Sequence, residues 1–169
     1  MTDGEPLDWD QIVELNAQRV LRVSLRILGS VQDAEDVSQD VFAEAFRLKK
    51  TTNIQNWEAF LVRLATLRSL DCLRRRHSFV ELRIDDRISS IEPADELAAR
   101  ELADWLRTSI SDLPDQQAAV FAMTYFEQLS RDDISEALSI SPEAVSTALY
   151  KARQDLLSQL AVFHRGENK

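Results

Sequence analysis

Two adjacent segments of the chain concentrate ionisable side chains of opposite sign. Residues 28–47 (LGSVQDAEDVSQDVFAEAFR) are rich in carboxylates, and residues 57–77 (WEAFLVRLATLRSLDCLRRRH) are rich in arginines. Carboxylates form charge-assisted hydrogen bonds with basic protein surfaces, and guanidinium groups form them with phosphates. This region therefore has the chemistry to bind two different macromolecules, one basic and one anionic.

The distribution of charge shows where nucleic acid can bind. The net charge is −9 over 169 residues, which speaks against uniform binding of nucleic acid because phosphate neutralisation supplies most non-specific affinity. Residues 47–77 nevertheless carry eight basic side chains against two acidic ones, Glu58 and Asp71, a balance of +6. Contacts to nucleic acid are predicted in that window.

Enzymatic and metal-binding chemistry finds little support. Cys72 is the only cysteine, so neither an intrachain disulfide nor a cysteine-based zinc site can form. His77 and Ser78 lie near Cys72, but Cys72 has an apolar helical context and His77 follows an arginine run. We interpret them as a structural thiol and a surface histidine. With no glycine-rich phosphate loop either, the sequence predicts no catalytic residue, no metal and no cofactor.

Helices are predicted to position both charged surfaces. Apolar residues at three- and four-residue steps, from Trp9 to Leu28, predict a helix over about 8–28, with Gly29 as its αL cap. The next helix opens at Ser30 or Asp33. Its expected buried stripe is Ala34, Val37, Val41, Ala45 and Leu48, and Glu35, Asp36, Gln39, Asp40 and Phe42 lie wholly or partly outside it. The third helix, from Trp57 to about His77, has Phe60, Leu61, Leu64, Leu67, Leu70 and Leu73 as its inner face.

A change of pattern divides the chain into two modules. Residues 78–94 lack a helical period and contain a Glu92-Pro93 step, which is unfavourable to a continuous helix, so we interpret them as a linker. Residues 1–77 form the first module, 95–163 the second, and 164–169 a tail. The fold class is all-α, with two small helical domains. We expect them to move independently, because the linker offers few apolar anchors.

A helix-turn-helix pattern occupies residues 129–153. Ser130 can cap a short helix ending near Leu138, and Ser141 with Pro142 can start another. The expected core is Ile134, Leu138, Ile140, Val145 and Leu149, and the side chains left to face a major groove are Glu143, Ala144, Ser146, Thr147, Tyr150 and Lys151. An ordinary helical hairpin is the alternative for this segment. Ser139 stands where the turn usually has glycine, so an αL conformation is less favourable there.

No segment is long and apolar enough to predict a membrane span, and the acidic amino-terminal sequence has no secretory pattern. We therefore expect a soluble cytoplasmic protein.

The acidic and basic segments together resemble the second region of bacterial sigma-70-type factors. Residues 111–156 (SDLPDQQAAVFAMTYFEQLSRDDISEALSISPEAVSTALYKARQDL) look like the fourth region of the same factors. The two signatures in this order, with a short linker, match the small extracytoplasmic-function sigma factors. The resemblance covers about three-quarters of the chain and implies a subunit that binds core RNA polymerase and directs promoter-specific initiation.

The resemblance assigns roles to the first module. The acidic helix implies docking on the clamp helices of the largest catalytic subunit of the polymerase through Asp33, Glu35, Asp36, Gln39, Asp40 and Phe42. The following helix implies recognition and melting of the minus-ten element, with Arg63, Arg68, Arg74, Arg75 and Arg76 on phosphates. Trp57 and Phe60 can stack on flipped bases, and core packing is the alternative for them.

In the second module the resemblance implies contact with the minus-thirty-five element through Ser141, Glu143, Ala144, Ser146, Thr147, Tyr150, Lys151 and Arg153. Arg153 has either a structural role or a phosphate contact. Residues 142–157 are electrically neutral, so affinity there is expected to come largely from tethering through the polymerase. Leu67 stands where the family often has asparagine, so capture of the melted strand is expected to use other residues.

The resemblance also implies an anti-sigma factor as a further partner. Two other functions remain open at this point: a stand-alone helix-turn-helix regulator and a divergent sigma paralogue without promoter recognition.

Overall fold

The computed structural model describes residues 8–80 and 94–166, and within them the chain forms helices joined by turns. The helices are α1 (Trp9–Leu28), α2 (Val31–Leu48), α3 (Trp57–Val80), α4 (Ala94–Ser111), α5 (Asp115–Tyr125), α6 (Arg131–Leu138) and α7 (Pro142–Gly166). The all-α prediction is confirmed. α3 continues three residues past the expected end at His77, and most of the predicted 78–94 linker lies outside the described residues.

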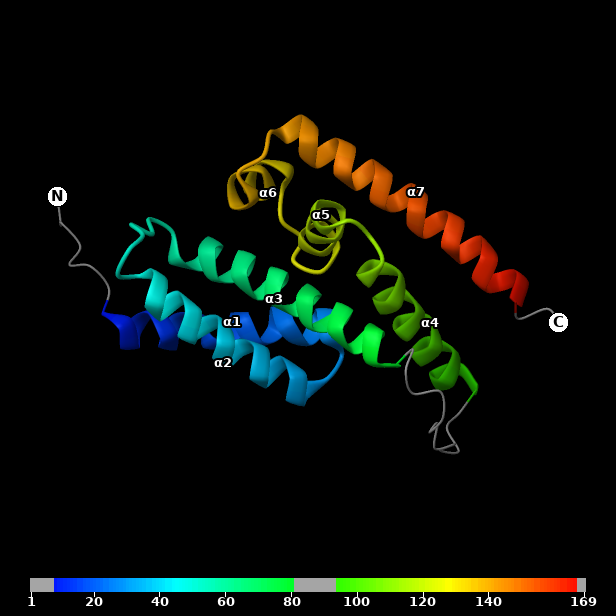
Figure 1. Ribbon diagram of the computed structural model, residues 1–169, viewed down its shortest axis with the longest axis horizontal. Coiled ribbons are helices and arrows are strands. Elements are labelled where there is room, and N and C mark those ends of the chain that lie inside the picture. Colours follow the sequence, from blue (N-terminus) through cyan, green and yellow to red (C-terminus); the bar gives the residue numbers. More distant parts are fainter. Residues whose placement is uncertain (1–7, 81–93, 167–169) are drawn as a thin grey trace.

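The first three helices form one bundle, with α3 packed against both α1 and α2 (Figure 1). Asp8 caps α1 in a capping box with Gln11, which satisfies amide groups that the helix leaves free. At the other end Gly29 adopts the predicted αL conformation, with φ 66°, and its N–H donates to the Leu25 carbonyl. Ser30 then caps α2 by accepting from the Asp33 amide.

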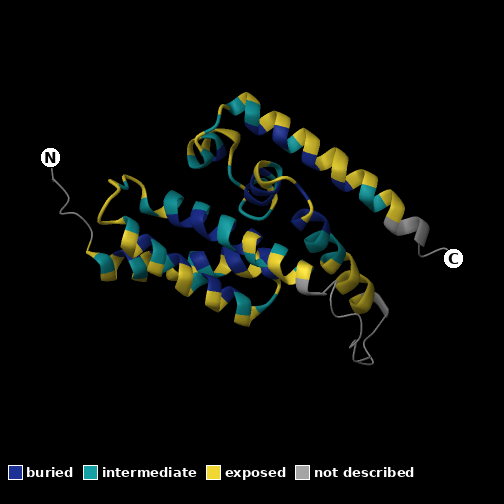
Figure 2. Ribbon diagram, viewed as in Figure 1, coloured by how far each residue is buried: buried dark blue, intermediate teal, exposed yellow. Residues whose placement is uncertain are grey.

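The apolar stripes of these helices meet in a common core (Figure 2). The buried residues of this core include Ile12, Val20, Val23, Ile27, Val37, Val41, Ala45, Leu61, Leu64, Leu70 and Leu73. The stripes predicted for α2 and α3 are thus largely confirmed, with Phe60 and Leu67 partly buried. On α1, Ala17 and Leu25 follow the same three- and four-residue steps as the buried residues but are exposed.

The second module contains the predicted helix-turn-helix. A small cluster forms from Val120 and Met123 of α5, Ile134 of α6 and Val145 of α7, with Leu138, Ile140 and Leu149 packed on it. Ser139 adopts the αL conformation with φ 54°, as the turn requires. On α4 the apolar side chains of Leu97 and Leu102 are 44% and 48% exposed.

The two modules are packed against each other. α5 lies between α3 and α7 (Figure 1), and Ile110, Leu113 and Ala118 join the same buried cluster as the α1–α3 bundle. Arg107 of α4 also donates to the carbonyl of Ile27 at the end of α1. This arrangement, which we call the closed arrangement, differs from the expectation of independent modules. The apolar contacts between the modules come from α4 and α5. The expectation of independent modules rested only on the few apolar residues of the linker.

Replacing Gly29 with alanine is expected to destabilise the closed arrangement. The left-handed backbone costs about 1–2 kcal/mol for a residue with a Cβ, and a Cβ here would overlap the guanidinium of Arg107. We expect the free energy of unfolding to fall by roughly 1–3 kcal/mol, measured by urea denaturation. Ser139→Gly is the control, because glycine relieves the left-handed backbone strain at that position and should raise the free energy of unfolding. A Gly29→Ala protein as stable as wild type would contradict this account.

Within residues 8–80 and 94–166, no helix has the length and apolar character needed to cross a bilayer.

Candidate functional site

The acidic surface of α2 is open to solvent. Glu35, Asp36, Gln39 and Asp40 are exposed, and their side chains form no ion pair or hydrogen bond with any described residue. The helix core behind them is Ala34, Val37 and Val41, all buried. The 3.6-residue period therefore presents four of the six predicted docking residues on one surface, which we call the acidic face.

The other two predicted docking residues, Asp33 and Phe42, lie differently. Asp33 forms an ion pair with Arg76 of α3, with 3.1 Å between carboxylate oxygen and guanidinium nitrogen. Phe42 is half-buried and packs edge-to-face against Trp9, 6.4 Å between ring centroids. Phe42 therefore lies only partly outside the buried stripe, because Trp9 of α1 covers that position.

Phe46 is a candidate that the sequence reasoning missed. Its side chain is 43% exposed, and it stands seven residues, or two helical turns, after Gln39, on the acidic face. Its ring also contacts Trp9 edge-to-face and lies under the Lys50 ammonium. The spacing from Gln39 was the signal that could have identified it.

Trp57 belongs to an aromatic cluster. Its ring lies 6.0 Å from both Trp9 and Phe60, edge-to-face in each case. Trp57 and Phe60 are half-buried and pack against the main core. This packing accounts for both residues structurally, and their proposed stacking on bases stays a prediction.

Arg68 is engaged inside the first module. It donates through Nε and Nη2 to both carboxylate oxygens of Glu44, at 2.7 and 2.6 Å, and through Nη1 to Asp71. The hydrogen bond from Arg68 holds the pKa of Glu44 below its ordinary value. The folded-state pKa is lowered, so the pair stabilises the fold at neutral pH, and this contribution is lost as the pH falls through that pKa.

Arg74 connects the two modules. Its guanidinium donates to the backbone carbonyls of Ser111 and Leu113, both at 3.2 Å, and pairs with Asp115 at 2.9 Å. Arg76 is engaged within the first module, where it donates to the Leu28 carbonyl at 3.1 Å and pairs with Asp33. In the closed arrangement these two predicted phosphate contacts are therefore directed at the protein itself.

Arg63 and Arg75 remain less engaged. Arg75 is exposed and forms no ion pair with a described carboxylate. The Nε of Arg63 is buried without a hydrogen-bond partner among the described residues. Arg75 is thus the α3 arginine most accessible to an external anion.

Burial raises the pKa of the Cys72 thiol, which keeps it protonated and unreactive at neutral pH.

The helix-turn-helix presents an exposed surface on the first turns of α7. Ser141 caps this helix by accepting from the Ala144 amide at 3.1 Å. Glu143, Ser146, Thr147, Tyr150 and Lys151 are exposed, with Tyr150 at 64%. Ala144 is half-buried. We call these exposed side chains the α7 face.

Arg153 has a structural contact. Its Nε donates to the hydroxyl of Tyr125 at 2.7 Å, and its guanidinium lies 5.5 Å from the centre of the same ring. The contact ties α7 to α5. The contact with Tyr125 agrees with the structural role considered for Arg153. Its alternative role, a contact to phosphate, stays a prediction.

Among the described residues, no group of histidine, cysteine or carboxylate side chains has an arrangement that can hold a metal ion.

Comparison with known protein families finds two matching regions. Residues 12–79 match the model described as sigma-70 region 2, and residues 103–156 match the model described as sigma-70, region 4. The first match covers α1–α3 with the acidic face. The second begins midway along α4 and covers α5 and the helix-turn-helix.

Two curated relatives align over most of this chain. The chain is 29% identical over 161 residues to the ECF RNA polymerase sigma factor SigE of Mycolicibacterium smegmatis, covering 90% of this chain and 62% of that protein. It is 26% identical over 172 residues to the ECF RNA polymerase sigma factor SigW of Bacillus subtilis, covering 93% of this chain and 91% of that protein. The chain thus spans less than two-thirds of the first relative and nearly all of the second.

Two solved structures share the fold. One is CnrH in complex with the cytosolic domain of CnrY, with a TM-score of 0.57, 18% identity and coverage of 91% of this chain and 88% of that chain. The other is the sigma factor RpoE of Bartonella quintana in complex with the anti-sigma factor NepR, with a TM-score of 0.55, 18% identity and coverage of 92% and 98%.

Proposed function

Because the chain belongs to the extracytoplasmic-function group of sigma-70-family RNA polymerase sigma factors, we propose that it docks on core RNA polymerase through the acidic face of α2. As a sigma factor it directs promoter-specific transcription initiation and is not itself a catalyst. The observation that carries the docking proposal is the exposed row Glu35, Asp36, Gln39 and Asp40, whose side chains have no partner among the described residues.

A surface of unpaired carboxylates on a rigid helix fits a basic partner helix. Charge-assisted hydrogen bonds to lysine or arginine would satisfy the carboxylates, and complementary potentials speed association. The clamp helices of the largest polymerase subunit are the proposed partner. Phe46 adds an apolar contact at the end of the acidic face, whereas Asp33 is paired with Arg76 of α3 in the closed arrangement.

The arginines of α3 are proposed to contact promoter DNA at the minus-ten element after the two modules separate. In the closed arrangement Arg74 donates to two neutral carbonyls and pairs with the exposed carboxylate of Asp115. Hydrogen bonds from a guanidinium to a charged phosphate are about twice as strong as neutral ones, and an exposed ion pair contributes little. DNA can therefore replace these partners. Arg75 needs no such exchange because it is already exposed.

The α7 face is proposed to read the minus-thirty-five element. Side-chain hydroxyls of Ser146, Thr147 and Tyr150 can donate to and accept from base edges in a major groove. The near-neutral charge of this helix gives little electrostatic attraction to DNA. Tethering through the polymerase raises the effective concentration and compensates for that weakness.

An anti-sigma factor is a further proposed partner. The support is the shared fold with CnrH and RpoE, each of which was solved with another protein bound, an anti-sigma factor in the case of RpoE. Such a partner would compete with core polymerase for the chain.

Run-off transcription tests the proposed function. Core polymerase with this chain is expected to give transcripts from a subset of genomic fragments, and core alone is expected to give none of them. Replacing Ser146, Thr147 and Tyr150 with alanine is expected to change which fragments are transcribed. If the chain binds DNA fragments without polymerase and yields no transcript with it, the stand-alone regulator is correct instead.

A further inference from the structure

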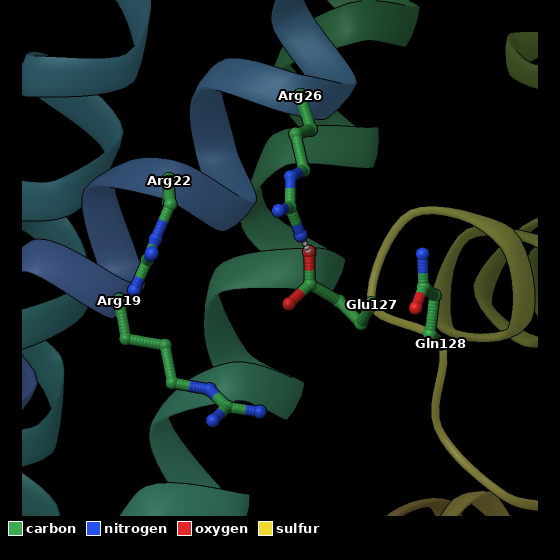
Figure 3. A pocket seen from close by; sticks show the side chains of 5 residues that line it. All are labelled: Arg19, Arg22, Arg26, Glu127 and Gln128. Atoms are coloured by element: carbon green, nitrogen blue, oxygen red, sulfur yellow. Dashed lines mark hydrogen bonds and ion pairs between the residues drawn. The ribbon is translucent and has the colours of Figure 1, made fainter.

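A hollow of about 260 Å³ lies between the two modules, and its lining includes no residue of the acidic face or of the α7 face. Its walls come from one side of α1 and from the turn between α5 and α6 (Figure 3). The lining residues are Arg19, Arg22, Arg26, Glu127 and Gln128. All five are polar, and none is required by the proposed contacts to polymerase or promoter.

The charges around the hollow are only partly compensated. Arg19, Arg22 and Arg26 follow one another at three- and four-residue steps, an arrangement of like charges that destabilises a helix slightly. Arg19 pairs with Glu58, and Arg26 pairs with Glu127 at 3.3 Å. Arg22 lies between them and has no ion pair or hydrogen bond with any described residue. The Arg19 Nε is also buried without a partner among those residues.

The turn that closes the hollow is held in an unusual conformation. Gln128 has φ 53°, a left-handed backbone that costs roughly 1–2 kcal/mol for a non-glycine residue. Arg26 fixes the preceding residues by donating to the Phe126 carbonyl at 2.7 Å and to the Glu127 carboxylate, which is only 5% exposed. Strained backbone of this kind often lies at ligand-binding positions.

We propose that this hollow binds a small phosphate-bearing anion, held by the guanidinium groups of Arg19 and Arg22 and by the side-chain amide of Gln128. Guanidinium groups match the geometry of phosphate oxygens and prefer them to single-point anions. Arg26 already neutralises Glu127, so the unpaired charge of Arg22 is available to the ligand. The lining includes no aromatic or aliphatic side chain, which argues against a nucleobase as the recognised part. The volume is below the usual range for larger organic ligands.

Such a ligand would favour the closed arrangement. Arg19 and Arg22 belong to the first module, and Gln128 to the second. An anion that contacts both binds the closed arrangement better than separated modules and shifts the equilibrium toward it. If the proposed function is correct, the ligand therefore opposes release of Arg74 for promoter binding.

The test uses the full chain and inorganic pyrophosphate, with binding measured by calorimetry at low salt. Wild type is expected to bind. Arg22→Gln is expected to weaken binding roughly ten- to a hundredfold, the effect of losing a hydrogen bond to a charged group. Gln128→Gly is expected to bind pyrophosphate less tightly because the side-chain amide is lost. Glycine also relieves the backbone strain at this position, so the weaker binding could not be ascribed to a destabilised fold. Arg131→Gln is the matched control, because Arg131 is an exposed arginine on α6 whose ion pair is with its neighbour Asp132.

Three results would overturn the proposal. The first is no binding of pyrophosphate, and the second is an equal loss in Arg131→Gln and Arg22→Gln. The third is that Arg22→Gln weakens binding of random-sequence duplex DNA as much as it weakens binding of pyrophosphate. That result would identify the hollow as a contact for the DNA backbone. Hydrogen exchange tests the bridging step: pyrophosphate should slow exchange in both 19–26 and 126–129, and slowing confined to α1 would refute it. None of these readouts involves polymerase, so their failure leaves the proposed transcription function standing.

Discussion

Reversing Asp36 and Asp40 to lysine is expected to weaken binding to core RNA polymerase by roughly a hundredfold or more. Each reversal replaces an attraction to a basic partner with a repulsion, and like charges placed together at an interface cost several kcal/mol. A total loss of about 3 kcal/mol already corresponds to that factor in the dissociation constant. Binding is measured by titrating labelled chain with core enzyme, and transcription should fall in parallel.

The fold should tolerate both reversals. Asp36 and Asp40 are exposed and their side chains have no partner among the described residues, and lysine favours a helix interior more than aspartate does. The matched control is Glu14→Lys with Glu101→Lys, two exposed carboxylates on α1 and α4 that give the same change in net charge. Wild-type affinity in the Asp36/Asp40 variant would show that the polymerase docks elsewhere. An equal loss of affinity for core polymerase in both variants would show that the effect comes from net charge and not from the acidic face.

Local features of this fold were predictable from sequence because each depends on a few neighbouring residues. Gly29 ends α1 in the left-handed conformation that only glycine adopts without strain. Ser130 and Ser141 cap α6 and α7 as their positions predict. The period of Val37 and Val41 also correctly separated the buried side of α2 from the acidic face.

Contacts between distant segments were not predictable in the same way. Arg74 donates to the carbonyls of Ser111 and Leu113, and every residue has a carbonyl, so no residue type reveals this pairing. The contact of Trp9 with Phe42 depends on how α1 crosses α2, which the spacing of residues within α2 does not reveal. The left-handed conformation of Gln128 was not predicted, because glutamine has no preference for that conformation. The neutral pattern of the α7 face was visible in sequence, but its contribution to DNA affinity depends on partners.

Replacing Arg74, Arg75 and Arg76 with alanine is expected to flatten the salt dependence of promoter binding by the holoenzyme. Each phosphate contact contributes about 0.7 to the log–log slope for single-stranded DNA and about 0.9 for duplex. Loss of all three contacts should therefore reduce the slope by about two to three units. Arg75→Ala alone should remove less than one unit, because a single contact is lost. The measurement is a salt titration on matched and scrambled upstream elements.

The α7 face supplies the contrasting variant for this measurement. Alanine at Ser146, Thr147 and Tyr150 removes neutral groups, so it should change sequence preference and leave the slope almost unchanged. Holoenzyme is required because Arg74 also holds the two modules together, and its loss in the free chain would change the conformation as well as the DNA contacts. In the holoenzyme we expect the polymerase to hold both modules in place, so the slope should count phosphate contacts alone. An unchanged slope in the triple-arginine variant would mean that these three arginines contact no phosphate and that the DNA-facing surface of the first module lies elsewhere.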